Sequence, residues 1–256
     1  MADDVSLNTQ GRKVFFLHPS ALVQNRIIDE LAQEEFEVYV IKDELKIKQA
    51  LELYPDSILL ASINEALKES AWIELIQGIH DDPSVGKVDI AFIASTSDEE
   101  TMKRYTDRFD FNCGYVVVKS DIEKAIKQIV AVLNGVNAKG RRKFMRLVTD
   151  KDNTTVNLPV NGTFKNGNIK DISTVGFSCV FSEDPVLAKN GFHGNIQLKL
   201  QGQLLKVEAI VFGFRADDNE KVYVFLFTKR VDGDIQSKIR KYIQTNLQSK
   251  MDGELK

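Results

Sequence analysis

The hydrophobic and polar positions follow different patterns in the two halves of the chain. Up to about residue 134, short apolar runs are separated by segments whose apolar residues recur with a helical period. Beyond residue 140, apolar and polar residues alternate, and short turn sequences interrupt the alternation. Strands buried on both faces read as apolar runs between helices, whereas half-exposed antiparallel strands alternate. The pattern therefore predicts an α/β domain followed by an all-β domain.

Five short apolar runs in the first half are predicted to be parallel strands. They lie at residues 13–17 (KVFFL), 37–41 (EVYVI), 57–61 (SILLA), 88–94 (VDIAFIA) and 115–118 (YVVV). A segment with an apolar face of helical period follows each run, as at Leu22–Phe36 and Ile122–Leu133. Five alternations of strand and helix predict a flavodoxin-like parallel sheet with strand order 2-1-3-4-5.

The second half contains short alternating segments that are separated by turn signals. These segments lie at residues 144–148, 155–160, 163–171, 176–181, 195–200, 204–214 and 221–227. Asn161-Gly162 is a favoured two-residue hairpin turn, and Gln201-Gly202 marks another tight turn. The pattern predicts a closed or nearly closed antiparallel β-barrel. Apolar residues at every fourth position of Ile235–Leu247 predict a final helix that covers one end of the barrel.

A small polar segment with two glycines, NGVNAKG at residues 134–140, marks the linker between the two domains. The predicted organisation is a tail at 1–11, an α/β domain at 12–134, a linker at 135–141, a barrel domain at 142–250 and a tail at 251–256. The linker therefore leads directly into the first residues of the barrel domain.

The composition of the 256 residues, 43% hydrophobic and 28% charged, is typical of a soluble globular protein. No apolar run approaches the ~18 residues of a membrane span, and the N-terminus lacks the hydrophobic segment of a secretory signal. Cys113 and Cys179 form no CxxC motif, so we expect buried thiols in a reducing cytoplasm. His18, His80 and His193 lack metal-ligand spacing, so no metal or other cofactor is expected.

Two polar motifs, separated by residues 147–170, lie at the start of the second half. The first is RRKFMR at residues 141–146, an RxxxR formed by Arg142 and Arg146 with Arg141 directly before it. The second is DISTVG at residues 171–176, a DxSxxG formed by Asp171, Ser173 and Gly176. Guanidinium groups can address guanine O6 and N7 or phosphate, and a carboxylate can accept from the guanine N1–H and N2–H₂ groups. A hydroxyl and a glycine N–H can approach phosphate closely, so together the motifs supply what a guanine nucleotide needs.

At these motifs the chain resembles the PilZ family, over residues 138–250. Members of that family bind the bacterial second messenger cyclic di-GMP on the outside of a small six-stranded β-barrel with a C-terminal helix. The resemblance implies that the binding residues here are Arg142, Arg146, Asp171, Ser173 and Gly176. It also implies that the arginine segment is a flexible lead-in that wraps around the ligand. In some members an arginine before RxxxR accompanies two stacked nucleotides, and Arg141 has that position here.

A second RxxxR, at Arg104 and Arg108, shows that this motif alone is not specific. It lies in a segment of helical period, where one-turn spacing and Asp107 predict a solvated charge cluster. The corresponding alternative for the binding motifs is a basic patch and an ordinary polar turn. The order of the two motifs, the loop before the arginines and the strand-like sequence around both favour ligand binding.

Charge is distributed unequally between the two halves. Residues 1–135 contain 14 Lys and Arg and 24 Asp and Glu, a net charge of −10, whereas residues 136–256 contain 20 and 13, a net charge of +7. The second half is therefore expected to bind an anion. Its aromatic residues mostly alternate within predicted strands and form no basic stacking platform, so a cyclic dinucleotide fits better than nucleic acid.

Residues 12–134 resemble the receiver domain of two-component signalling. The strand order carries the resemblance, together with Gly114–Lys119, which is similar to that family's last strand and its lysine. A receiver also needs an acidic pair after its first strand and an aspartate at the end of its third strand to hold Mg²⁺ and accept phosphate. This chain has His18-Pro19 and Ala61-Ser62 at those places. We therefore predict a pseudo-receiver that serves as an interaction surface, with an unrelated flavodoxin-like domain as the alternative.

These features predict a cytoplasmic cyclic di-GMP receptor rather than an enzyme, because no paired catalytic carboxylates, nucleophile–base pair or metal cluster is present in the sequence. Ligand binding is expected to order the RxxxR linker and to reposition the pseudo-receiver, which signals to a protein partner. No membrane partner is expected. The alternatives are a PilZ-type adaptor that has lost ligand binding and a cyclic di-GMP-responsive regulator that binds nucleic acid.

Overall fold

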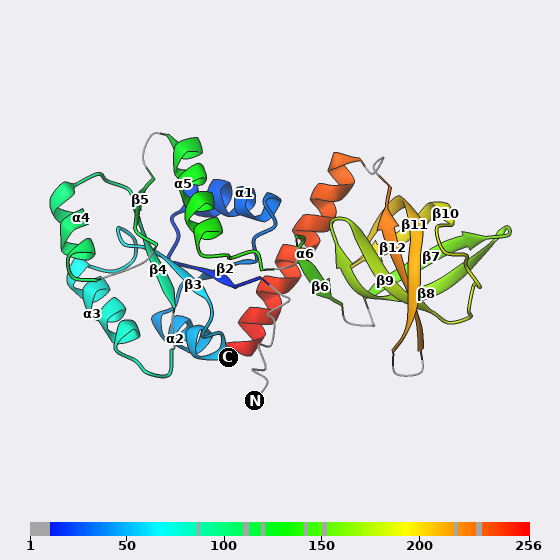
Figure 1. Cartoon of the computed structure of the whole chain (residues 1–256), viewed down its shortest axis with the longest axis horizontal. Coiled ribbons are helices and arrows are strands. Elements are labelled where there is room, and N and C mark those ends of the chain that lie inside the picture. Colours follow the sequence, from blue (N-terminus) through cyan, green and yellow to red (C-terminus); the bar gives the residue numbers. More distant parts are fainter. Residues whose placement is uncertain are drawn as a thin grey trace, which may run out of the picture. The chain divides into compact units, whose positions relative to one another are not determined.

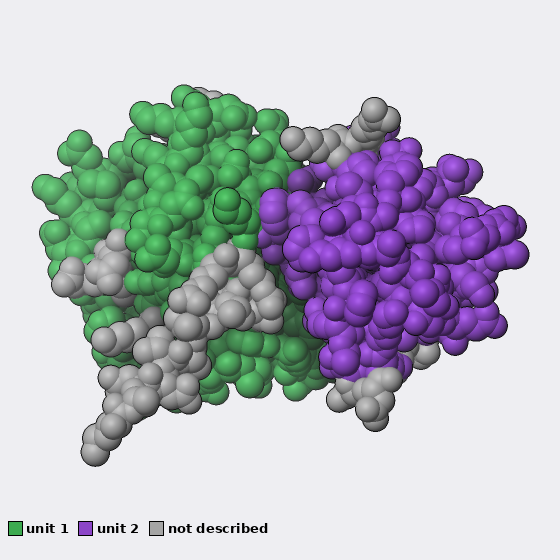
Figure 2. Space-filling view, turned by 45° about the vertical axis from the view of Figure 1, so that its right-hand side comes forward, with its two compact units in different colours: residues 1–143, 247–256 green, residues 144–246 purple. Residues whose placement is uncertain are grey.

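The computed structural model describes residues 11–85, 88–109, 113–118, 121–140, 143–149, 153–217, 220–228 and 232–256. Contacts divide the chain into two compact units, as Figure 2 shows. One unit comprises residues 1–143 and 247–256, and the other comprises residues 144–246. Figure 1 shows that the first unit combines helices with a parallel sheet and that the second is mainly a β-barrel.

The first unit is built on a five-stranded parallel sheet. Its strands are β1 (Val14–Leu17), β2 (Val38–Ile41), β3 (Ile58–Ser62), β4 (Asp89–Ala94) and β5 (Tyr115–Val117). They pair in the order β2-β1-β3-β4-β5, so the predicted order 2-1-3-4-5 is confirmed. Strands β1 and β3 are buried along their whole length, as expected for inner strands of a sheet that helices cover on both faces.

Helices pack on both faces of this sheet. They are η1 (Val23–Ile27, a π-helix), α1 (Ile28–Gln33), α2 (Glu44–Leu53), α3 (Glu69–His80), α4 (Glu99–Thr106) and α5 (Ile122–Gly135). Asp43, Asp98 and Asp121 cap α2, α4 and α5 by accepting hydrogen bonds from free backbone N–H groups. One apolar cluster contains residues of α2, α3 and α4, and a second contains residues of η1, α1 and α5. The first cluster surrounds Trp72, which is fully buried.

The last turns of α6 (Gly233–Glu254) belong to the first unit, whereas its earlier turns belong to the second. Met251 and Leu255 are each only 2% exposed and join the apolar cluster of α2, α3 and α4. The sequence predicts a helix that ends at Leu247 and a tail from residue 251, but the structure continues the helix to Glu254. The reason is that the four-residue spacing of apolar side chains continues through Met251 and Leu255.

The second unit is an antiparallel β-barrel of six strands followed by the first part of α6. The strands are β7 (Thr154–Val160), β8 (Thr163–Ser173), β9 (Gly176–Phe181), β10 (Phe192–Leu200), β11 (Gln203–Asp217) and β12 (Glu220–Phe227). They close in the order β8-β7-β10-β11-β12-β9, because β9 also pairs with β8. A short strand β6 (Arg146–Val148) pairs with β8. The predicted six-stranded antiparallel barrel with a C-terminal helix is confirmed.

Turns and the first part of α6 complete the barrel. Asn161-Gly162 has positive φ angles of 48° and 79°, the backbone of a two-residue hairpin turn, as the sequence predicts. Ile239 and Ile243 of α6 are fully buried. The side-chain hydroxyls of Tyr242 on α6 and Thr154 on β7 are hydrogen-bonded at 3.0 Å. This part of α6 is therefore held to the barrel by both apolar and polar contacts.

Candidate ligand site on the barrel

The register of three neighbouring strands aligns the residues of both polar motifs. Arg146 on β6 is paired with Ser173 on β8, and Ser173 is paired with Gly176 on β9. Two residues further along β8, Asp171 is paired with Ser178 on β9. Side chains alternate between the two faces of a strand, and the neighbours of these residues fill the core, so the motif residues face outward. We call Arg146, Asp171, Ser173 and Gly176 the motif face.

Asp171 is the negative centre of this face. Its Oδ1 lies 3.3 Å from Nη1 of Arg146. Its Oδ2 accepts a hydrogen bond of 2.5 Å from the hydroxyl of Ser178, and Nη2 of Arg215 lies 4.0 Å from the same oxygen. The Asp171 side chain is only 12% exposed, and burial of a carboxylate is costly unless it is paired and hydrogen-bonded. Arg146 and the hydroxyl of Ser178 therefore hold it in place, and the guanidinium of Arg215 lies nearby.

Ser173 and Gly176 have visible structural roles in the connection from β8 to β9. The hydroxyl of Ser173 donates to the carbonyl oxygen of Gly176 at 3.1 Å and accepts from the N–H of Val175 at 3.4 Å. A Cβ at position 176 would lie 2.2 Å from the backbone oxygen of Phe225, so only glycine allows β9 to approach β12 this closely. These two residues shape the turn, whereas Arg146 and Asp171 provide the charged groups of the site.

The structure brings together four of the six residues that the sequence predicts for the site. Arg146, Asp171, Ser173 and Gly176 lie on one face of the barrel. The other two, Arg141 and Arg142, lie outside the described residues. Their assignment to the ligand site therefore stays a prediction.

Arg215 is a charged residue near the site that the sequence motifs do not indicate. The alternating pattern predicts a strand that ends at Phe214, but β11 continues to Asp217 and carries Arg215 within it. A nearby ion pair of 2.7 Å joins Nζ of Lys170 on β8 to Oε2 of Glu220 on β12. The end of the β11–β12 hairpin thus lies beside β8. A longer predicted strand would have included Arg215, but it would not have shown that this residue lies near Asp171.

Both cysteines are buried and free, as the sequence predicts. Burial, and then the charge of Asp171, raises the pKa of the Cys179 thiol well above its ordinary value. Burial also raises the pKa of the Cys113 thiol, to about 11. Both thiols are therefore protonated at neutral pH and pack as small apolar groups.

The positions at which the sequence departs from a receiver site lie at the ends of β1 and β3. The Nε2 atom of His18 is 2.7 Å from a carboxylate oxygen of Glu44. Ser62 is 3% exposed and lines a pocket of about 70 Å³ together with Ser20, Asn64 and other residues. Within the described ranges, no cluster of His, Cys, Asp or Glu could hold a metal ion, and no helix is long and apolar enough to span a membrane. Lys119, the residue similar to the receiver lysine, lies outside those ranges.

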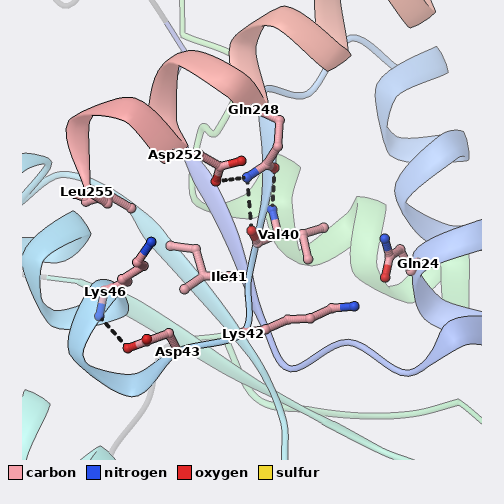
Figure 3. Close-up of a pocket in the computed structure, with 9 residues that line it drawn as sticks. All are labelled: Gln24, Val40, Ile41, Lys42, Asp43, Lys46, Gln248, Asp252 and Leu255. Carbon is pink, nitrogen blue, oxygen red and sulfur yellow. Dashed lines mark hydrogen bonds between the residues drawn. The ribbon is translucent and has the colours of Figure 1, made fainter.

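A larger pocket of about 440 Å³ lies in the α/β unit beside the end of β2 and the last turns of α6 (Figure 3). On one side of it, the side-chain amide of Gln248 bonds to both backbone groups of Val40. Its Nε2 donates to the Val40 carbonyl at 3.0 Å, and its Oε1 accepts from the Val40 N–H at 2.8 Å. The amide therefore satisfies the edge strand of the sheet much as another strand would.

The charges around this pocket are balanced. Lys42 and Lys46 supply two positive charges, and Asp43 and Asp252 supply two negative charges, as Figure 3 shows. Asp43 is already engaged as the cap of α2, and Asp252 accepts a hydrogen bond from Gln248. The pocket contains none of the predicted site residues and has no net preference for an anion, so the motif face is the better candidate for the functional site.

No model of a known protein family matches the sequence, and no curated protein matches it. Solved structures do show similarity. YcgR from Escherichia coli in complex with c-di-GMP is 14% identical with a TM-score of 0.39, and the match covers 45% of this chain and 50% of that chain. The PilZ domain of the same protein with c-di-GMP is 13% identical with a TM-score of 0.38, and the match covers 44% of this chain and 96% of that one.

A third similar structure is the MrkH–c-di-GMP complex of K. pneumonia, which is 22% identical with a TM-score of 0.37. That match covers 45% of this chain and 57% of MrkH. The chain thus spans about half the length of the YcgR and MrkH structures. At these identities and TM-scores, the function has to be argued from the residues of the site itself.

Proposed function

We propose that this protein is a receptor that binds cyclic di-GMP on the motif face of its barrel. The observation that supports the proposal most is the position of Arg146 beside Asp171, with 3.3 Å between the guanidinium Nη1 and the carboxylate Oδ1. These residues belong to two separate sequence motifs, and the register of β6, β8 and β9 joins them with Ser173 and Gly176. Opposite charges that lie this close can engage the donors and acceptors of one guanine nucleotide together.

Each charged residue has a defined task in this proposal. Asp171 accepts from the guanine N1–H and N2–H₂ groups, and the hydroxyl of Ser178 keeps its carboxylate oriented. Arg146, whose side chain is 40% exposed, has donors available for guanine O6 and N7 or for phosphate. We assign Arg141 and Arg142 to the same ligand as further guanidinium donors, on the evidence of the motif alone. Binding and charge neutralisation are the whole function of the site, so the protein is a receptor and not an enzyme.

The signalling step is proposed from the sequence. Arg141 and Arg142 lie between the α/β domain and the barrel, and several positive charges are concentrated there. A doubly anionic ligand neutralises these charges, and each charge-assisted hydrogen bond contributes about 1.5–3 kcal/mol toward ordering the segment. Ordering of the segment changes the position of the α/β domain, which is a pseudo-receiver and presents its surface to a protein partner.

Titration calorimetry of the full chain with cyclic di-GMP tests the binding site. We expect the wild type to bind and Arg146→Ala to lose at least about tenfold in affinity, the equivalent of one charge-assisted hydrogen bond. Arg104→Ala is the matched control because Arg104 begins the other RxxxR and is paired with Glu69 on α3 at 2.6 Å. The control should bind like the wild type. Absence of binding by the wild type, or equal affinity of wild type and Arg146→Ala, would defeat the proposal.

A further inference from the structure

The end of the β11–β12 hairpin reaches the motif face from a second direction. Strand β11 is 15 residues long, and its pairing with β12 continues to Asp217 and Glu220. A register shift between Val211 and Gly213 bends this ladder. The ion pair between Glu220 and Lys170 holds the end of the hairpin beside β8, the strand that carries Asp171.

Arg215 is the residue of this hairpin end that points to Asp171. Its Nη2 atom lies 4.0 Å from Oδ2 of Asp171, too far for a hydrogen bond but close enough for charge attraction. Its side chain is 51% exposed. Among the described residues, no hydrogen bond engages its guanidinium. Most of its donors are therefore free for another partner.

The two guanidinium groups approach Asp171 from opposite sides of β8. Arg146 comes from β6, which pairs with one edge of β8. Arg215 comes from β11, which is reached from the other edge through β9 and β12. Asp171 therefore lies between two guanidinium groups that can both contact a ligand. The sequence motifs indicate only one of them, Arg146.

The row of strand partners that leads from Asp171 toward β11 carries small side chains. From Asp171 the register runs to Ser178, to Val224 and to Gly213. These four positions span about 14 Å, given a strand separation of about 4.8 Å. Apart from Asp171 itself, their side chains are small and uncharged, and a Cβ at Gly213 would have no atom within 4 Å. A ligand that is held at Asp171 therefore meets no large side chain that belongs to this row, and the group that it meets above the row is Arg215, whose Nη2 reaches to 4.0 Å from Asp171 Oδ2.

We propose that Arg215 is a further ligand-binding residue, which donates to a phosphate of the bound cyclic di-GMP from the hairpin side. This inference rests on the proposed function. A phosphate oxygen is a better partner for Arg215 than the carboxylate it now faces, because Nη2 of Arg215 lies 4.0 Å from Asp171 Oδ2, beyond hydrogen-bond distance, and the Asp171 carboxylate is assigned to the guanine. A planar guanidinium with free donors can form two parallel bonds to phosphate. Arg146 and Arg215 then hold the ligand from its two sides.

Calorimetry with cyclic di-GMP on full-length Arg215→Ala, Arg215→Lys and Lys206→Ala tests this role. Lys206 is an exposed residue of the same strand, nine positions earlier, so its loss removes the same charge away from the site. We expect at least about tenfold weaker binding for Arg215→Ala, because one charge-assisted contact is lost. Arg215→Lys should recover part of the affinity, since lysine keeps the charge but not the planar fork. Lys206→Ala should bind like the wild type.

The outcomes separate the two proposals. If the wild type binds and Arg215→Ala binds equally well or more tightly, Arg215 does not contact the ligand and this inference is wrong, while the proposed function stands. If Lys206→Ala loses as much affinity as Arg215→Ala, the effect is one of general charge and the inference is again wrong. If the wild type does not bind cyclic di-GMP, both proposals fail together.

Discussion

Met251→Ala should destabilise the α/β unit, although the sequence pattern places residue 251 in a tail. Met251 is 2% exposed and belongs to the apolar cluster that contains Trp72 and Leu255. The substitution removes most of a buried apolar side chain and leaves a cavity in a packed core. Such changes lower the free energy of unfolding by about 2–5 kcal/mol. The same change in a free tail would have almost no effect.

Urea unfolding followed by Trp72 fluorescence measures this effect. Trp72 is the only tryptophan of the chain, and it is fully buried in the same cluster as Met251. With a urea dependence of about 2 kcal/mol per M, a loss of 2–5 kcal/mol lowers the midpoint by about 1–2.5 M. The fluorescence signal therefore reports on the unit in which the substitution lies.

Met102→Ala is the matched control for this experiment. Met102 lies on α4 of the same unit, but it is 38% exposed. Its replacement should change the free energy of unfolding by no more than about 0.5 kcal/mol. If the midpoints of Met251→Ala and Met102→Ala both equal that of the wild type, the end of α6 does not stabilise the α/β unit and our interpretation of residues 247–255 is wrong.

Two further predictions concern the barrel. Gly176→Ala should lower the melting temperature of the barrel, measured by circular dichroism, because the new Cβ would lie 2.2 Å from the Phe225 backbone oxygen. Gly213→Ala is the control and should not lower it, because a Cβ at position 213 would have no atom within 4 Å. Equal melting temperatures of the two variants would contradict the close packing of β9 against β12. A hydrogen bond from Tyr223 lowers the pKa of Asp184 from 3.8 to about 2, so Asp184 stabilises the fold above pH 4 and this contribution is lost as the pH falls toward 2. Asp184→Asn should therefore unfold at lower urea concentration than the wild type at pH 6, and the difference should disappear near pH 2.

The fold was largely predictable because its signals are local. Each apolar run of the first half is a strand in the structure, and the strand order follows from the right-handed connections of a doubly wound sheet. The end of α6 was not predictable in this way. Gln248 bonds to Val40, which is 208 residues earlier, and Met251 and Leu255 pack in a core built mainly from the first half. The spacing of four residues could have extended the predicted helix, but no local pattern could show what the helix covers.

The candidate site divides into a predictable and an unpredictable part for a similar reason. Arg146, Asp171, Ser173 and Gly176 belong to motifs that are each continuous in sequence, and the antiparallel pairing of β6, β8 and β9 brings them together. Arg215 is 44 residues beyond Asp171, and its position depends on barrel closure and on the bend of β11. Such a contact arises only from the three-dimensional path of the chain, so no motif spacing could have indicated it.

The different roles of the motif residues bear on the alternative of an adaptor that has lost ligand binding. Ser173 and Gly176 would be kept in such a protein, because they form the turn and allow close packing of β9 against β12. Asp171 would not be needed, since a carboxylate that is 12% exposed is costly to bury and its ion pair with the partly exposed Arg146 contributes little stability. A hydrophobic or small polar residue would serve the fold better at that position. The presence of Asp171 between two guanidinium groups therefore favours a barrel that binds its ligand over one that only displays a surface.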